Sequence, residues 1–168
     1  ALNQPASIPF AHIRAVVEQD PGWSHTNLST SDFDVQFQKA DIKEARFGAD
    51  NVNLDKLRSR GGKLLTWHGA NDPLILPYGS WEYWGRLFDR YGGPAGTEDF
   101  FRAFSFPGVG HCGGGAAPQP PNLFDVLVNW VENGVAPDHL VGTQNLGGGT
   151  TRSRKVCKYP NEAVYNGS

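Results

Sequence analysis

The sequence predicts an α/β fold built on parallel strands, of which this chain supplies only a part. Between residues 63 and 134 the order is strand, loop, helix, strand, loop, helix, which is the pattern of a parallel sheet with crossover helices. Two predicted strands are too few for a parallel sheet that is covered on both faces. We therefore expect the sheet to be completed by a partner chain or by a missing N-terminal half of the protein.

Residues 1–50 predict a loop-rich segment with little regular structure. Turn-forming residues are frequent there and the apolar residues show only weak periodicity, particularly over residues 19–32. The exception is the stretch 8–19, which predicts a short helix. We treat residues 1–50 and 51–168 as two separate regions, because the structural signals become stronger from residue 51 onward.

Three local patterns follow in residues 51–77. The stretch 51–62 predicts a short helix with Leu54 and Leu57 on one face, ended by glycine. The segment "KLLTWHG", residues 63–69, predicts a buried strand bounded by glycines. Residues 70–77 form a loop that contains an Asp-Pro turn signal.

An amphipathic helix and a second strand come next. Residues 80–93 place large apolar side chains at helical spacing and end in two glycines. The apolar face of this helix consists of Trp81, Trp84, Leu87, Phe88 and Tyr91. The segment "FFRAFSF", residues 100–106, predicts the second strand.

The stretch 117–134 predicts the last helix. Asn122 can cap its first turn and Gly134 can end it. The expected buried stripe consists of Leu123, Val126, Leu127, Trp130 and Val131. Residues 147–168 are expected to form extended surface structure.

Charge and hydropathy argue against two classes of function. The formal net charge is −2, from 15 basic and 17 acidic residues, whereas a nucleic-acid-binding domain is typically strongly basic. No stretch approaches the roughly 18 consecutive apolar residues that a membrane helix needs. We therefore expect neither a nucleic-acid partner nor a membrane span.

Other features favour a processed, secreted chain. The sequence contains no Met and begins "ALNQPASIPF", which lacks the charged and apolar segments of a signal peptide, so we expect an N-terminus made by proteolysis of a longer precursor. The triplets at Asn27 and Asn166 match the acceptor motif for N-glycosylation and, with the processed start, favour secretion. Cys112 and Cys157 form no CxxC motif, which excludes a zinc ribbon or a redox pair.

The segment "PGVGHCGGG", residues 107–115, contains a G-x-G-x-x-G match that first suggests a dinucleotide-binding loop. That motif needs a helix directly after its last glycine, and the prolines between residues 118 and 121 prevent one. A metal site is also disfavoured, because His111 and Cys112 are adjacent in sequence and cannot easily reach one ion together. His68 and Asp72 lie on two sides of a turn, so no metal site is predicted.

A catalytic histidine accounts for the same segment better. Asp72 follows the first strand and His111 follows the second, in the order acid then histidine that α/β-hydrolases use after their serine. Adjacent ends of parallel strands would place the carboxylate beside the imidazole, where it can orient the ring and stabilise its charged form. No G-x-S-x-G motif is present, and Ser80 and Ser105 lie in a helix start and a strand. The nucleophilic serine is therefore expected outside this chain.

Four segments closely resemble the tannase and feruloyl esterase family. They are "KLLTWHGANDPLILP", "FFRAFSFPGVGHCGGG", "NWVENGVAPDHL" and "KVCKYPNEAVYNG". The resemblance covers roughly residues 51–165, and residues 1–50 match weakly through "VVEQDPGWS". It implies that residues 51–168 are the C-terminal part of an α/β-hydrolase catalytic domain, and that residues 1–50 follow the lid region.

The resemblance also implies a function. The chain would belong to a secreted serine carboxylic-ester hydrolase for phenolic acid esters of the gallate or ferulate and cinnamate type, with Asp72 as the triad acid and His111 as the base. Cys112 would form a disulfide bond with a cysteine beside the serine. The serine, the oxyanion hole and a calcium-binding lid would lie on the N-terminal chain of the same precursor, and this chain would carry no cofactor.

Several alternatives stay open at the level of sequence. The enzyme could act on a different acyl group, or the chain could be a non-catalytic binding fragment that kept a hydrolase scaffold. Cys112 could instead pair with Cys157 within the chain, and the partner of Cys157 is otherwise undetermined. His68 is expected to be structural rather than a ligand or a base.

Overall fold

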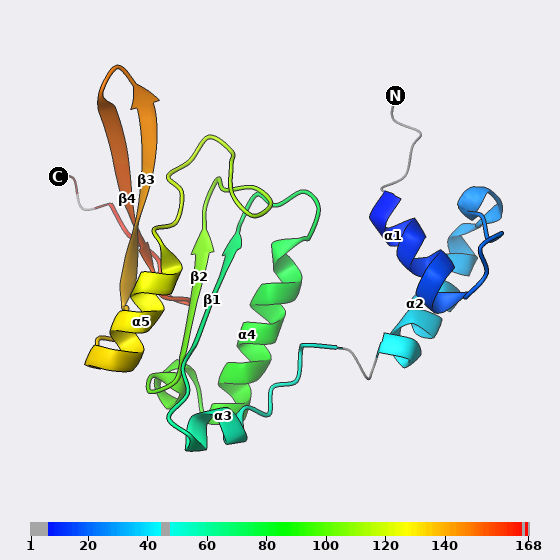
Figure 1. The fold of residues 1–168 in the computed structure, drawn as a ribbon, viewed down its shortest axis with the longest axis horizontal. Helices are drawn as coiled ribbons and strands as arrows, with labels where there is room; N and C mark the ends of the chain where they lie inside the picture. The colour runs from blue at the N-terminus through cyan, green and yellow to red at the C-terminus, as the bar shows by residue number, and fades with distance from the viewer. Residues whose placement is uncertain (1–6, 45–47, 166, 168) are drawn as a thin grey trace. The chain divides into compact units, whose positions relative to one another are not determined.

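The computed structural model describes residues 7–44, 48–165 and 167 (Figure 1). The chain divides into two compact units, Ala1–Asn51 and Val52–Ser168. Within the described ranges, no helix is both long enough and apolar enough to cross a membrane.

The first unit is helical. Helix α1 (Ser7–His12) runs directly into a π-helical turn (Ile13–Val17), which confirms the helix predicted in this stretch. A short 3-10 helix (His25–Asn27) follows, and then the helix α2 (Thr30–Glu44). Helix α2 was not predicted, and the expectation of a loop-rich segment is wrong there.

The physical reason for the missed helix is the absence of an apolar stripe. Phe33 and Phe37 are each 65% exposed and Ile42 is 77% exposed, so no single face of α2 is buried. The start of the helix did carry a local signal. Asp32 Oδ2 accepts hydrogen bonds from the backbone N–H and the hydroxyl of Ser29, both at 2.7 Å, and the bond from the N–H is one half of a capping box.

The second unit contains the predicted parallel strands. Its elements are α3 (Asp55–Ser59), β1 (Leu64–Gly69), α4 (Pro77–Tyr91), a 3-10 helix (Pro94–Thr97), β2 (Phe101–Phe106), α5 (Leu123–Asn133), β3 (His139–Gly147) and β4 (Thr150–Cys157). Strands β1 and β2 pair in parallel, in a register that runs from Leu64 opposite Phe101 to Gly69 opposite Phe106. The predicted strand–helix–strand order is therefore confirmed.

Both faces of β2 are buried, which explains why its sequence is almost continuously apolar. Phe101 and Ala103 pack in a cluster with the apolar face of α4, while Phe104 and Phe106 belong to a second cluster that includes residues of α5. Alternate residues of a strand point to opposite faces, so the two helices cover opposite sides of the strand pair, as Figure 1 shows.

The two long helices follow their sequence signals with two corrections. Helix α4 begins at Pro77, three residues before the predicted start, because proline is well suited to the first helical turn. In α5 the side chain of Asn122 accepts a hydrogen bond from the N–H of Phe124, and Gly134 ends the helix in a left-handed conformation. Trp130 is buried, but Val131 is 58% exposed and does not belong to the buried stripe.

The C-terminal segment contains the extended, mostly exposed structure that was expected, as strand β4, but it pairs with the unpredicted strand β3 in a β-hairpin. Strands β3 and β4 pair antiparallel from His139 opposite Cys157 to Gly147 opposite Thr150. Only Leu140 and Gly142 of β3 are buried, so its hydrophobic pattern was too weak to indicate a strand. The glycines Gly147 to Gly149 all have positive φ and form the turn.

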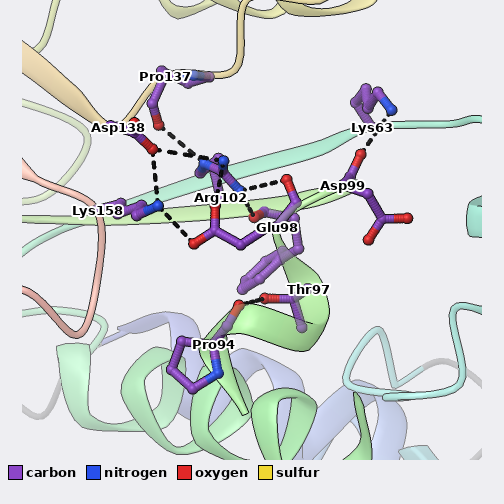
Figure 2. Close-up of polar contacts among 10 residues, drawn as sticks. Lys63, Pro94, Thr97, Glu98, Asp99, Arg102, Pro137, Asp138 and Lys158 are labelled. Atoms are coloured by element: carbon purple, nitrogen blue, oxygen red, sulfur yellow. Dashed lines mark hydrogen bonds and ion pairs between the residues drawn. The ribbon is translucent and has the colours of Figure 1, made fainter. Parts of the chain in front are cut away.

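A charged cluster joins the hairpin to the sheet (Figure 2). Arg102 of β2, only 5% exposed, pairs with Glu98 at 2.7 Å and donates a hydrogen bond to the carbonyl of Pro137. Lys158, after β4, contacts Glu98 at 2.6 Å and Asp138 at 2.8 Å. Two cations alternate with two carboxylates, so the cluster compensates the cost of burying the Arg102 guanidinium.

Candidate functional site

Asp72 and His111 meet at the carboxyl ends of the two parallel strands. The loop after β1 carries Asp72 and the loop after β2 carries His111, and Figure 1 shows both loops leaving the sheet at the same end. His111 Nδ1 lies 2.9 Å from Asp72 Oδ2. An ionised carboxylate can only accept hydrogen bonds, so the Nδ1–H of His111 donates.

The Asp72 carboxylate is buried and held by its own turn. Its side chain is 4% exposed, and Oδ1 accepts hydrogen bonds from the N–H groups of Leu74 at 2.8 Å and Ile75 at 3.0 Å. Burial raises the pKa of Asp72, but hydrogen bonds from the Ile75 N–H, the His111 ring and the Leu74 N–H outweigh burial and lower this pKa to about 2. Asp72 therefore both stabilises the Asp-Pro turn and accepts a hydrogen bond from His111.

The His111 loop lies directly against the end of β1. The N–H of Asn71 donates to the carbonyl of Val109 at 3.0 Å, and the Val109 side chain is fully buried. A Cβ atom on Gly69 would lie 2.5 Å from the carbonyl oxygens of Val109 and Gly110, so only glycine allows this approach. The anchored loop leaves the His111 side chain 41% exposed. With Nδ1–H hydrogen-bonded to Asp72, Nε2 is the ring nitrogen that can accept a proton from a reacting group.

A second imidazole reaches the same carboxylate, and sequence analysis did not assign it there. His68 Nε2 lies 3.3 Å from Asp72 Oδ2 and 2.9 Å from the carbonyl oxygen of Ile75. His68 Nδ1 lies 2.8 Å from Ser80 Oγ in the first turns of α4. The sequence feature that could have indicated this contact is the spacing, because His68 stands near the end of β1 and Asp72 follows it by four residues.

The glycine-rich segment 107–115 folds back on itself and is not followed directly by a helix. The side chain of Gln119 accepts from the N–H of Gly114 and donates to its carbonyl, both at 2.9 Å. The next helix begins only at Leu123. This geometry does not provide the helix N-terminus that a dinucleotide loop needs. No group of three or more His, Cys, Asp and Glu that could hold a metal ion occurs among the residues that the structure describes.

The two cysteines are free thiols in this chain. Cys112, beside His111, is exposed and has a positive φ of 54°. Cys157 is half-buried at the end of β4, and the disulfide partners of both cysteines stay a prediction. The side chain of Asn27 and the whole of Asn166 lie outside the described residues, and glycosylation at both stays a prediction.

Comparison with known proteins identifies the family. A model of the family described as tannase and feruloyl esterase matches residues 8–168. The chain belongs to this family. The "Probable feruloyl esterase" of Arthroderma benhamiae is 35% identical over 168 aligned residues, which cover 97% of this chain and 31% of that protein.

Two crystal structures from Aspergillus oryzae show the same fold. An esterase aligns with a TM-score of 0.81 and feruloyl esterase B with 0.72, each at 28% identity and over 94% of this chain and 34% of the solved chain. The chain thus has part of an α/β-hydrolase fold, which confirms the predicted fold class. It spans about a third of the length of the relatives that it matches.

Proposed function

We propose that this chain supplies the acid and the base of a Ser-Asp-His triad in a serine carboxylic-ester hydrolase for phenolic acid esters. The observation that carries the proposal is the 2.9 Å hydrogen bond between His111 Nδ1 and Asp72 Oδ2 at adjacent strand ends. Family membership supports ester hydrolysis as the reaction that this pair performs.

The chemistry follows from the free nitrogen of His111. Its Nε2 accepts the proton of the serine hydroxyl while the serine oxygen attacks the ester carbonyl carbon. The same nitrogen then returns the proton to the departing alcohol, which leaves an acyl-enzyme. Water repeats the attack with His111 as base, and the phenolic acid and the serine are released.

Asp72 keeps its negative charge throughout this cycle. Its pKa is lowered to about 2, so it stays ionised while His111 gains and loses a proton. The carboxylate holds the ring with Nδ1–H toward itself and stabilises the imidazolium that forms in each half-reaction. A neutral Asp72 would do neither.

The nucleophile comes from another part of the protein in this proposal. No G-x-S-x-G motif occurs in the sequence, and Ser80, which lies in α4, is hydrogen-bonded to His68. An N-terminal chain of the same precursor would bring the serine, the oxyanion hole and a lid that binds calcium. The position of Cys112 next to His111 suits a disulfide bond to that chain, and a secreted location suits such a bond.

Ferulate esters are the first substrates to test, because a relative and a solved structure similar to this chain both carry the name feruloyl esterase. The complete protein should hydrolyse a ferulate or a gallate methyl ester. His111→Ala and Asp72→Asn should each lower kcat by about 10⁴-fold, through loss of the base or of its tautomer. The exposed His139, at the start of β3, provides the control His139→Gln. Near-normal turnover in His111→Ala would show that the proposed role is wrong.

A further inference from the structure

We propose that His68 is a positioning residue for the Asp72 carboxylate, and that Ser80 holds His68 in the tautomer that this role needs. The inference rests on the proposed function, in which Asp72 orients the base His111. It assigns a task to a second histidine and to a serine that the Ser-Asp-His scheme leaves unused.

The hydrogen-bond partners of His68 decide where its proton lies. A backbone carbonyl can only accept, so the 2.9 Å contact with the Ile75 oxygen requires a proton on Nε2. In the neutral ring Nδ1 is then an acceptor, and the Ser80 hydroxyl donates to it across 2.8 Å. Ser80 lies on α4, so the first turns of that helix hold the ring in place.

The same nitrogen lies beside Asp72. Nε2 is 3.3 Å from Oδ2, so the imidazole contacts the carboxylate while its proton is bonded to the Ile75 carbonyl. Asp72 thereby receives three N–H hydrogen bonds, from Leu74 and Ile75 to Oδ1 and from His111 to Oδ2, and the His68 ring lies against Oδ2 as well.

The different contacts of the two oxygens give His68 its role. The backbone donors hold Oδ1, but small changes in the χ1 and χ2 angles of Asp72 would still move Oδ2 relative to His111. The His68 ring restricts that movement, since its side chain is 13% exposed and bonded on both nitrogens.

Steady-state kinetics of the complete enzyme on a ferulate methyl ester test the role. His68→Leu removes the polar contact with Asp72 at similar volume and should lower kcat by about 10- to 100-fold, because a misplacement of about 1 Å can cost about 100-fold. KM should stay within about twofold, since the lost contact acts on the transition state. His68→Gln places an amide N–H near the position of Nε2 and should recover most of the loss. His139→Gln should match the wild type.

A second measurement does not depend on turnover. The proton on His111 Nδ1, which bridges to Asp72, gives a proton NMR signal that reports the geometry of this hydrogen bond. The signal should shift or broaden in His68→Leu, return toward the wild-type position in His68→Gln, and be unchanged in His139→Gln. Ser80→Ala keeps the imidazole and should give a smaller shift, and it replaces His68→Leu if that variant fails to fold.

The outcomes separate the inference from the function on which it rests. If wild-type protein hydrolyses neither ester while the signal responds as expected, the proposed function fails and the positioning role stands. An unchanged signal in His68→Leu, or in Ser80→Ala where the first variant does not fold, would overturn the inference. It would also be overturned if His68→Gln were no more active than His68→Leu at equal thermal stability.

Discussion

The buried carboxylate of Asp72 has two structural roles, one in its own turn and one in the candidate site. It closes its own turn through two backbone N–H groups, and on its other oxygen it accepts a hydrogen bond from His111 and contacts the His68 ring. A buried charge is costly unless it is paired and hydrogen-bonded, and here three donors meet that requirement. The arrangement that makes the turn stable is therefore also the one that keeps the residue ionised.

The lowered pKa of Asp72 leads to a prediction for acid stability. Its ordinary value is 3.8 and the folded value is about 2, so the unfolded chain binds more protons between these values. The stability that the carboxylate contributes is present above pH 3.8 and is lost as the pH falls toward 2. Thermal unfolding of wild type and Asp72→Asn, measured between pH 5 and pH 2, should show a stability difference that shrinks over this interval. A constant difference would mean that Asp72 titrates normally.

At the scale of elements, the site depends on how closely one loop approaches one strand. The His111 loop contacts the end of β1 through the Asn71–Val109 hydrogen bond, at a point where Gly69 leaves no room for a side chain. Helix α4 contributes through Ser80, whose hydroxyl lies 2.8 Å from Nδ1 of His68 in β1. The positions of the acid and the base are thus set by contacts between β1, its following helix and the loop after β2.

Two glycine substitutions should therefore have opposite effects. In Gly69→Ala the new Cβ would meet backbone oxygens at 2.5 Å, and the loop must move, which should destabilise the fold by about 1–3 kcal/mol and lower turnover with it. Gly85 lies within α4 with nothing inside 4 Å of its Cβ position. Gly85→Ala should stabilise by about 0.5–1 kcal/mol through helix propensity. Urea unfolding and ester turnover of both variants check this, and a harmless Gly69→Ala would remove the argument for the close approach.

At the scale of the whole molecule, the sheet within the described residues is small for the fold to which it belongs. Strands β1 and β2 form a two-stranded parallel sheet, whereas parallel sheets are stable when they are larger and covered on both faces. The segment directly after Asp72 also exposes apolar side chains, with Leu74 at 63% and Leu76 at 69%. Both features suit a chain that packs against the remainder of a larger hydrolase.

A disulfide from Cys112 to the chain that carries the serine is the matching prediction. The Ser Oγ and His Nε2 must approach to about 2.6–3.2 Å, and a bond beside His111 would hold the two loops at that separation. Peptide mapping of the complete protein without reduction should recover a Cys112 peptide linked to the other chain. Mild reduction should abolish turnover before the fold melts. A free Cys112, or one joined to Cys157, would contradict the prediction.

Much of the fold and the main pair of the site could be predicted because their signals are local. Neighbouring residues suffice to show the periodicity of strands and helices, the Asn122 cap and the glycines that end helices. The parallel pairing of the two strands then brings Asp72 and His111 together at the strand ends. The C-terminal hairpin and helix α2 could not be predicted in this way, because neither has a continuous apolar face.

The sequence alone thus determined the order of the elements between residues 63 and 134 and placed an acid and a histidine at adjacent strand ends. Only the tertiary structure decided that the His68 ring contacts the Asp72 carboxylate, since that contact needs a turn and a helix start to meet. It also decided that Arg102 is buried among charges from three separate segments (Figure 2). The physical reason is the same in both cases. Periodicity reports which face of an element is buried, but the partner of a polar side chain depends on distant segments that only folding brings within hydrogen-bond reach.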